Sequence, residues 1–242
     1  MTRQRSRLRW LPFAVTALAM IATPLRPKGK RSALASVVVA ALAATTFVSA
    51  QRRWGTRRSL CAFATIGAAT LGVEAVGTRT GKVFGAYQYS SALRPQIGHV
   101  PAIVPLAWFA MAVPSRETAI ALNRAWRIPI GAALLTAWDL FLDPQMVGEG
   151  YWAWARKGRY RGIPFSNYVG WFATSLAVMA SLEATLPPGE PDAALVGEYG
   201  WMAVMQTLGF AAFFRDPLVA LTGGSAMLPP ALLALRRVRT RG

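Results

Sequence analysis

The apolar run IPIGAALLTAWDLFL at residues 128–142 carries Asp139 near its end and is followed directly by Asp143 and Pro144. A helix places residues that are four apart on one face, so the two carboxyl groups are expected one turn from each other. Ionised groups are costly to bury in apolar surroundings. The run therefore predicts an apolar helix, and its two carboxyl groups are candidates for function.

The whole chain has the composition of an integral membrane protein. Of its 242 residues, 54% are hydrophobic and 15% are charged, and the mean hydropathy is +0.33. Charged residues usually make up about 25% of a soluble domain. The net charge of +17 comes from short Lys and Arg clusters between apolar runs, as in membrane flanks, and not from an amphipathic basic face. We expect contact with membrane lipid and none with nucleic acid.

Successive apolar runs predict an all-α fold, a polytopic membrane bundle of about eight transmembrane helices. The helices are expected near 10–25, 32–50, 59–77, 99–114, 128–142, 164–182, 199–214 and 217–235. The first run is short and contains two prolines, so seven spans are the alternative. Residues 1–242 are expected to form a single transmembrane domain with basic tails at 1–9 and 236–242. A small excess of Lys and Arg on the side of the termini favours cytoplasmic termini in the cell membrane.

An eight-helix arrangement brings most residues capable of chemistry to one membrane face. They lie at helix ends or in loops on that face: Glu74, Tyr87, Tyr89, His99, Asp139, Asp143, Trp152, Trp154, Asn167 and Asp216. The opposite face receives mainly arginines and turn residues. With one histidine and one cysteine, Cys61, the chain lacks a zinc-ligand pattern, and no phosphate-binding loop is present. We expect the active site at the first face, with neither a metal nor a cofactor.

Four ordered motifs resemble the membrane-bound carotenoid biosynthesis family, which includes carotenoid 1′,2′-hydratases and bisanhydrobacterioruberin hydratases. The motifs are EAVGTRTGKVFGAYQY at 74–89, VPAIVPLAW at 100–108, DLFLDP at 139–144 and GIPFSNYVGW at 162–171. The resemblance is detailed from Glu74 to Trp171 and general elsewhere. Two positions depart from the family pattern: Gln88 stands where a histidine is expected in many relatives, and His99 where an apolar residue is expected.

The resemblance implies a hydratase that adds water to the terminal C=C of a linear or monocyclic carotenoid dissolved in the membrane. In acid catalysis, a proton adds to the less substituted carbon and water captures the resulting tertiary carbocation. The reaction needs a carboxyl group that stays protonated and groups that stabilise a cation. Asp139 and Asp143 fit the roles of acid and partner, because like charges one turn apart disfavour double ionisation. Glu74 is the third catalytic candidate.

Six residues near these carboxyl groups are the candidates for substrate binding: Tyr87, Tyr89, Trp152, Trp154, Asn167 and Trp171. Each has a simpler structural interpretation. Tyr and Trp at a membrane interface are usually anchors, and an Asn at a helix start usually caps the helix. For the carboxyl groups, the alternatives are a helix stop at Asp143, pairing of Asp139 with an arginine, and a salt bridge from Glu74 to Arg79 or Lys82.

Two other functions fit the same sequence. A carotenoid end-group cyclase or isomerase would begin from the same protonated carboxyl group but lose a proton instead of gaining water. A non-catalytic membrane scaffold or small-molecule transporter is the alternative of another class, although transporters more often show paired half-repeats, and none is evident here. Association with other carotenoid enzymes and the oligomeric state are left open.

Overall fold

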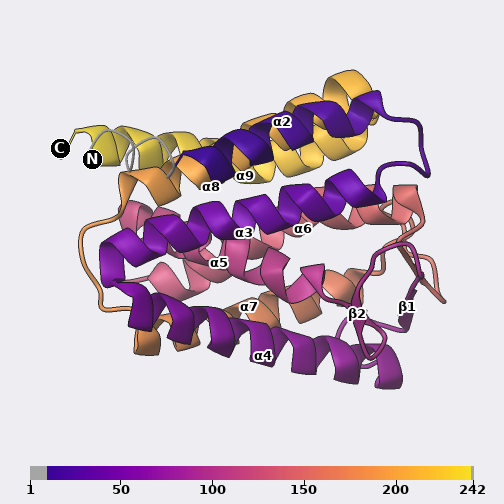
Figure 1. Ribbon diagram of the computed structural model, residues 1–242, viewed down its shortest axis with the longest axis horizontal. Helices are drawn as coiled ribbons and strands as arrows, with labels where there is room; N and C mark the ends of the chain where they lie inside the picture. Colours follow the sequence, from indigo (N-terminus) through magenta and orange to yellow (C-terminus); the bar gives the residue numbers. More distant parts are fainter. Residues whose placement is uncertain (1–9, 241–242) are drawn as a thin grey trace.

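The computed structural model describes residues 10–240 as a bundle of helices (Figure 1). Within this range the α-helices are α2 (Leu11–Leu25), α3 (Ser32–Trp54), α4 (Thr56–Thr80), α5 (Ile103–Leu122), α6 (Arg127–Glu149), α7 (Phe165–Thr185), α8 (Ala193–Leu208) and α9 (Pro217–Arg239). A π-helical segment, η1 (Gly209–Phe213), continues α8. Each of the eight predicted runs coincides with one α-helix, so the all-α fold class is confirmed.

The helices run back and forth along the long axis of the bundle (Figure 1). The start of α2 and the end of α9 lie at one end, and the short strands lie at the other. Helix α5 occupies the centre, because it packs against α3, α4, α6, α7, α8 and α9. Its residues 107–121 are all buried. The predicted basic tail at 1–9 lies outside the described residues, and the tail at 236–242 continues α9 as far as Arg239.

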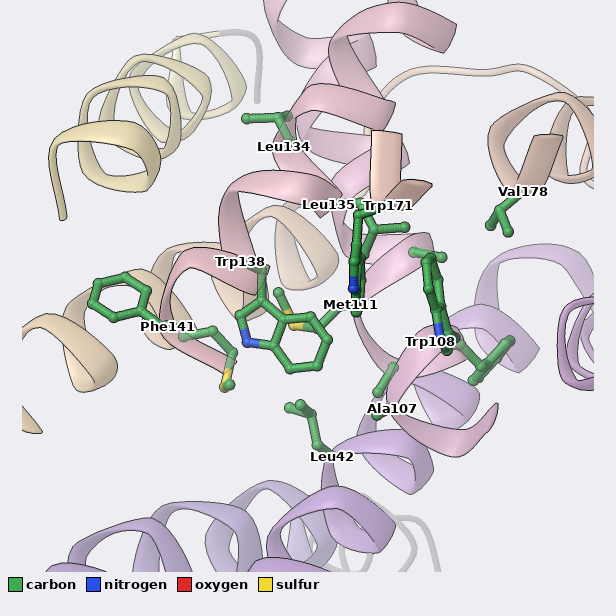
Figure 2. Close-up of a cluster of buried hydrophobic side chains, with 14 of the residues drawn as sticks. Leu42, Ala107, Trp108, Met111, Leu134, Leu135, Trp138, Phe141, Trp171 and Val178 are labelled. Carbon is green, nitrogen blue, oxygen red and sulfur yellow. The ribbon is translucent and has the colours of Figure 1, made fainter. Parts of the chain in front are cut away.

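The core is aromatic where α5, α6 and α7 meet. Trp108 of α5 stacks on Trp171 of α7 with ring centroids 4.0 Å apart and planes 13° apart, and Trp138 of α6 meets Trp171 edge-on. Figure 2 shows these three indoles together, with Leu42 of α3 approaching Trp138. Offset stacking and edge contacts are the favourable geometries for aromatic pairs. Tryptophans from α5, α6 and α7 therefore pack together in the interior of the bundle.

The outer surface carries apolar side chains that suit a lipid environment. Leu18 of α2, Leu221 of α9 and Phe165 of α7 are 68%, 72% and 79% exposed. By length and composition, three of the described helices are able to cross a membrane: α3, α4 and α9. Helix α2, with 15 residues, is shorter than the roughly 20 residues of a span. The number of spans therefore stays a prediction.

The stretch from Arg116 to Arg127 falls between two of the predicted helices, near 99–114 and 128–142, but the structure is helical there as far as Leu122. The guanidinium of Arg116 contacts the carboxylates of Glu117 and Glu183 at 2.7 Å each, and Arg127 contacts Glu183 at 2.6 Å. Arg116 and Glu117 are each only 1% exposed. Buried charges are tolerated when each has a well-placed partner. We call these four residues the ion-pair cluster. Glu183 lies far from both arginines in the sequence, so the local composition around the arginines does not reveal its part in the cluster.

Candidate active site

Two helices end in the same way at the strand-bearing end of the bundle. Gly81 after α4 and Gly150 after α6 have φ of +66° and +75°, the left-handed conformation that glycine adopts without a steric penalty. The chain leaves each helix there and forms a strand, β1 (Tyr87–Tyr89) after α4 and β4 (Trp152–Trp154) after α6. Two further short strands, β2 (Gln96–Ile97) and β3 (Val100–Pro101), pair with each other.

Strands β1 and β4 pair antiparallel, with Tyr87 opposite Trp154 and Tyr89 opposite Trp152. Alternate residues of a strand point to the same face, so these four rings gather on one side of the ribbon. The ring centroids are 5.6 Å apart in the first pair and 5.4 Å in the second. Gln88, between the two tyrosines, points to the other side and is exposed. The pairing thus places four predicted binding residues together and turns Gln88 away from them.

Glu74, in the last turns of α4, is surrounded by neutral hydrogen-bond donors. The hydroxyls of Tyr87 and Tyr89 donate to its Oε2, the second at 2.7 Å, and Trp108 Nε1 lies 3.4 Å from its Oε1. Burial, and next the nearby Glu74 carboxyl, raise the pKa of both tyrosines, so both hydroxyls keep their protons and act as donors. The alternative salt bridge from Glu74 to Arg79 or Lys82 is not formed.

Asp139 and Asp143 form a buried pair held by Asn167 of α7. Asn167 Nδ2 donates to Asp139 Oδ2 at 2.7 Å and to Asp143 Oδ2 at 2.5 Å. Trp152 Nε1 donates to Asp143 Oδ1 at 3.0 Å, and the Asp139 and Asp143 carboxyl groups lie close together on the one Asn167 amide nitrogen. Asp139 Oδ1 has no hydrogen-bond partner in the described part of the chain. Asn167 therefore joins two aspartates from another helix instead of capping its own.

The carboxyl groups differ from the ion-pair cluster in lacking a cation. Glu74, Asp139 and Asp143 are 5%, 0% and 2% exposed, and no ion pair formed by residues 10–240 includes any of them. No group of His, Cys, Asp and Glu in that range has an arrangement that could hold a metal ion. Three carboxyl groups are thus buried with neutral donors alone, and none of them meets a cation that would neutralise its charge.

A cavity of about 260 Å³ lies against this cluster. Eight of the nine predicted site residues line it: Glu74, Tyr87, Tyr89, Asp143, Trp152, Trp154, Asn167 and Trp171. Asp139 does not line the cavity, although Asn167, which donates to both aspartates, does. His99 is also absent from the lining, and its Nε2 lies 2.5 Å from the hydroxyl of Thr78. Asp143 is therefore the member of the aspartate pair that a molecule in the cavity would meet.

Two tryptophans that were not among the predicted site residues also line the cavity: Trp108 and Trp138. Trp108 lies within one of the four motifs and Trp138 directly precedes Asp139, so their places in the sequence could have marked them as site residues. Gly170 lets α7 approach this region closely, since a Cβ there would lie 2.2 Å from the Val83 carbonyl oxygen. The loop that leads into β1 is thereby held against α7.

Residues 31–237 match the carotenoid biosynthesis protein family. The chain belongs to this family. The match covers most of the bundle and includes every predicted site residue. The family and the apolar helices together indicate that this carotenoid biosynthesis protein associates with a membrane.

A relative of this carotenoid biosynthesis protein is bisanhydrobacterioruberin hydratase from Haloarcula japonica. It is 33% identical over 131 residues, which are 51% of this chain and 44% of the relative. The chain thus matches less than half the length of that protein. No solved structure matches the chain.

Proposed function

We propose that this carotenoid biosynthesis protein is a hydratase that adds water to the terminal C=C of a linear or monocyclic carotenoid. The observation that carries the proposal is the cavity, apolar over most of its wall and bounded at one end by carboxyl groups without a cation. Such a cavity suits an apolar end group that must receive a proton. The name of the Haloarcula relative supports the same reaction class.

Asp143 is the proton donor in this proposal. It lines the cavity, whereas Asp139 behind it touches only protein. Two carboxyl groups in contact cannot both ionise at low cost, so the pair shares one proton, as in other carboxyl dyads. Asp139 is thus a positioning residue that keeps the proton available to Asp143, and Asn167 fixes the distance between the two groups through both of its amide hydrogens.

Glu74 has the complementary role of stabilising the carbocation. Three donors surround its carboxylate, and a carboxylate that accepts several hydrogen bonds is favoured in its charged form. A negative charge on Glu74 would also disfavour ionisation of Asp143. The indole faces of Trp108, Trp138 and Trp171 add the electrostatic attraction of aromatic rings for a cation.

The reaction balances without a cofactor. Asp143 transfers its proton to the less substituted carbon of the terminal C=C, and the adjacent carbon becomes a tertiary cation. Water adds to that carbon and returns one proton to the aspartate pair. One water is consumed, one tertiary alcohol forms, and the acid is restored.

The reaction is tested by expression in a host that accumulates lycopene or a monocyclic carotene. We expect a product heavier by one water with its visible absorption almost unchanged, because the terminal double bond is isolated from the conjugated chain. In ¹⁸O-labelled water the new hydroxyl should carry the label. A product of unchanged mass with blue-shifted absorption would replace the hydratase with a cyclase, and the absence of any product would favour a scaffold or transporter.

We also propose that the protein is multi-pass, with cytoplasmic termini and the active site at the opposite face. Arg57 and Lys157 are exposed and lie at opposite ends of the bundle. In a Cys61→Ser background, cysteines at these two positions should react with an impermeant thiol reagent from opposite sides of the membrane. Reaction of both from the same side would contradict the eight-span topology.

A further inference from the structure

The cavity is polar at one end and apolar at the other. Its apolar end is walled by α2, α3, α8 and η1, through residues such as Met20, Val39, Met202 and Phe210. The polar side chains there are Thr23, whose hydroxyl donates to Ala19 of its own helix, and Gln206. A chain-like apolar molecule can therefore lie against this end at little desolvation cost.

Several side chains that line the apolar end also reach the outer surface. Ile21 of α2, Phe213 of η1 and Leu208 at the end of α8 line the cavity and are 50%, 55% and 54% exposed. The cavity therefore opens sideways, between α2 and η1, among apolar side chains. In a membrane-embedded bundle such an opening faces lipid.

Both walls of this opening depart from the regular α-helix. Pro24 lies inside α2 and cannot donate the hydrogen bond that would hold the last turn. Residues 209–213 are π-helical, a form that occurs mostly as single turns at functional sites. Next to this opening, Arg31 contacts Glu149 at 2.6 Å and lies 5.3 Å from the centre of the ring of Phe214, which lines the cavity. The opening thus lies between two irregular helical segments, α2 and η1, and the contacts of Arg31 hold the chain beside it.

We infer that this opening is a lateral portal through which the polyene chain of the substrate extends from the cavity into the lipid, with Ile21 and Phe213 contacting the chain just beyond its reacting end. The inference rests on the proposed function. Its physical basis is size, because about 260 Å³ lies below the range of roughly 300–1,000 Å³ typical of drug-sized ligands. The cavity holds the end group of a long polyene and leaves the remainder outside.

Bulky substitutions at the portal test the inference. Ile21→Trp and Phe213→Trp should raise the KM for a full-length carotene by about tenfold or more, because added volume in a packed passage is destabilising. A truncated polyene with the same end group, short enough to lie within the cavity, should be much less affected. The matched controls are Leu18→Trp, one turn away on α2, and Leu221→Trp on α9, both highly exposed and outside the cavity lining. Equal effects on both substrates, or effects as small as in the controls, would overturn the portal.

Chemical modification of a cysteine in the folded protein tests the same inference without depending on whether a bulky variant folds. In a Cys61→Ser background, Ile21→Cys protein is assayed before and after reaction with a bulky thiol reagent, with Leu18→Cys as the control. We expect modification at position 21 alone to block the full-length substrate. Retention of polyene by the purified protein is measured in parallel and does not depend on hydration. If modification at position 21 leaves the retention of polyene unchanged, the portal is rejected. If the unmodified protein retains polyene but does not hydrate it, the proposed function is rejected and the portal still stands.

Discussion

Both ends of the bundle bury charged residue types, but they do so in different ways. At the ion-pair cluster, two carboxylates meet two guanidiniums at 2.6–2.7 Å. At the cavity, Glu74, Asp139 and Asp143 meet only tyrosine, tryptophan and asparagine donors. In the first arrangement, opposite charges neutralise each other, and in the second the carboxyl groups have only neutral partners.

This difference separates structural from chemical use of buried acids. A paired carboxylate stays ionised and stabilises the fold as long as its partner is present. A carboxyl group without a cation tends to hold a proton in apolar surroundings and can give it to a substrate, as proposed for the aspartate pair, unless several donors stabilise its ionised form, as proposed for Glu74. Substitutions at the ion-pair cluster should therefore lower the stability of the protein, whereas substitutions at the cavity should lower its turnover.

The largest effect on turnover is expected at Asp143. Asp143→Asn keeps the shape of the side chain but supplies no carboxyl proton, so turnover should fall by about 10²–10⁴-fold while the protein still accumulates in the membrane. Product per folded protein is the measurement. Glu117→Gln is the matched control at the ion-pair cluster and should retain turnover per folded molecule. Similar losses of turnover in the two variants would contradict the view that the carboxyl groups at the cavity are catalytic and those at the ion-pair cluster are structural.

At the ion-pair cluster, Arg116→Met should act on stability. It leaves Glu117 and part of Glu183 without their cation, and breaking a buried pair costs about 3–5 kcal/mol. We expect less protein in the membrane and a lower Tm in detergent, with near-normal turnover in the folded fraction. A stable Arg116→Met protein that has lost turnover would instead place this cluster in the mechanism.

Asp139→Asn should have an intermediate effect. The variant removes the second member of the aspartate pair but keeps a partner for Asn167, so Asp143 stays in place with a less favoured proton. We expect turnover to fall by about 10–100-fold, the scale associated with a misplaced reacting group. Turnover would be measured against pH, because a positioning residue changes the pH profile of its partner. A normal rate and profile would remove Asp139 from the mechanism.

The smallest effect is expected at the tyrosines around Glu74. Tyr89→Phe removes one of the three donors to Glu74, and a typical hydrogen bond contributes a net of about 0.5–1.5 kcal/mol, so turnover should fall by about two- to tenfold. Tyr160→Phe is the control, because its hydroxyl donates to the Leu140 carbonyl and does not line the cavity. Equal rates in the two variants would show that Glu74 does not depend on its donors.

The sequence was sufficient to predict the helices and the site face, because both depend on local patterns. Apolar runs located all eight helices, and alternation of helix ends grouped Glu74, Asp143 and Asn167 before any contact was known. The strand pair was not predicted, because β1 and β4 have three residues each, and three residues are too few to show the alternation of buried and exposed side chains that identifies a strand.

Other features depend on contacts between distant residues. Arg116 looked like part of a connector because its partner Glu183 lies far along the chain. That Asp143 and not Asp139 faces the cavity follows from how α6 is rotated in the bundle, and spacing alone does not fix this rotation. The portal is formed by α2 and η1, two segments from opposite ends of the sequence.

Infrared spectroscopy of the purified protein tests the proton on the aspartate pair, since a protonated carboxyl group absorbs apart from a carboxylate. At neutral pH, the wild-type protein should show a protonated-carboxyl band that is lost in the double variant Asp139→Asn/Asp143→Asn and retained in Glu117→Gln. If the difference spectrum of the double variant lacks that band and shows only the loss of carboxylates, the aspartate pair is ionised and cannot be the acid.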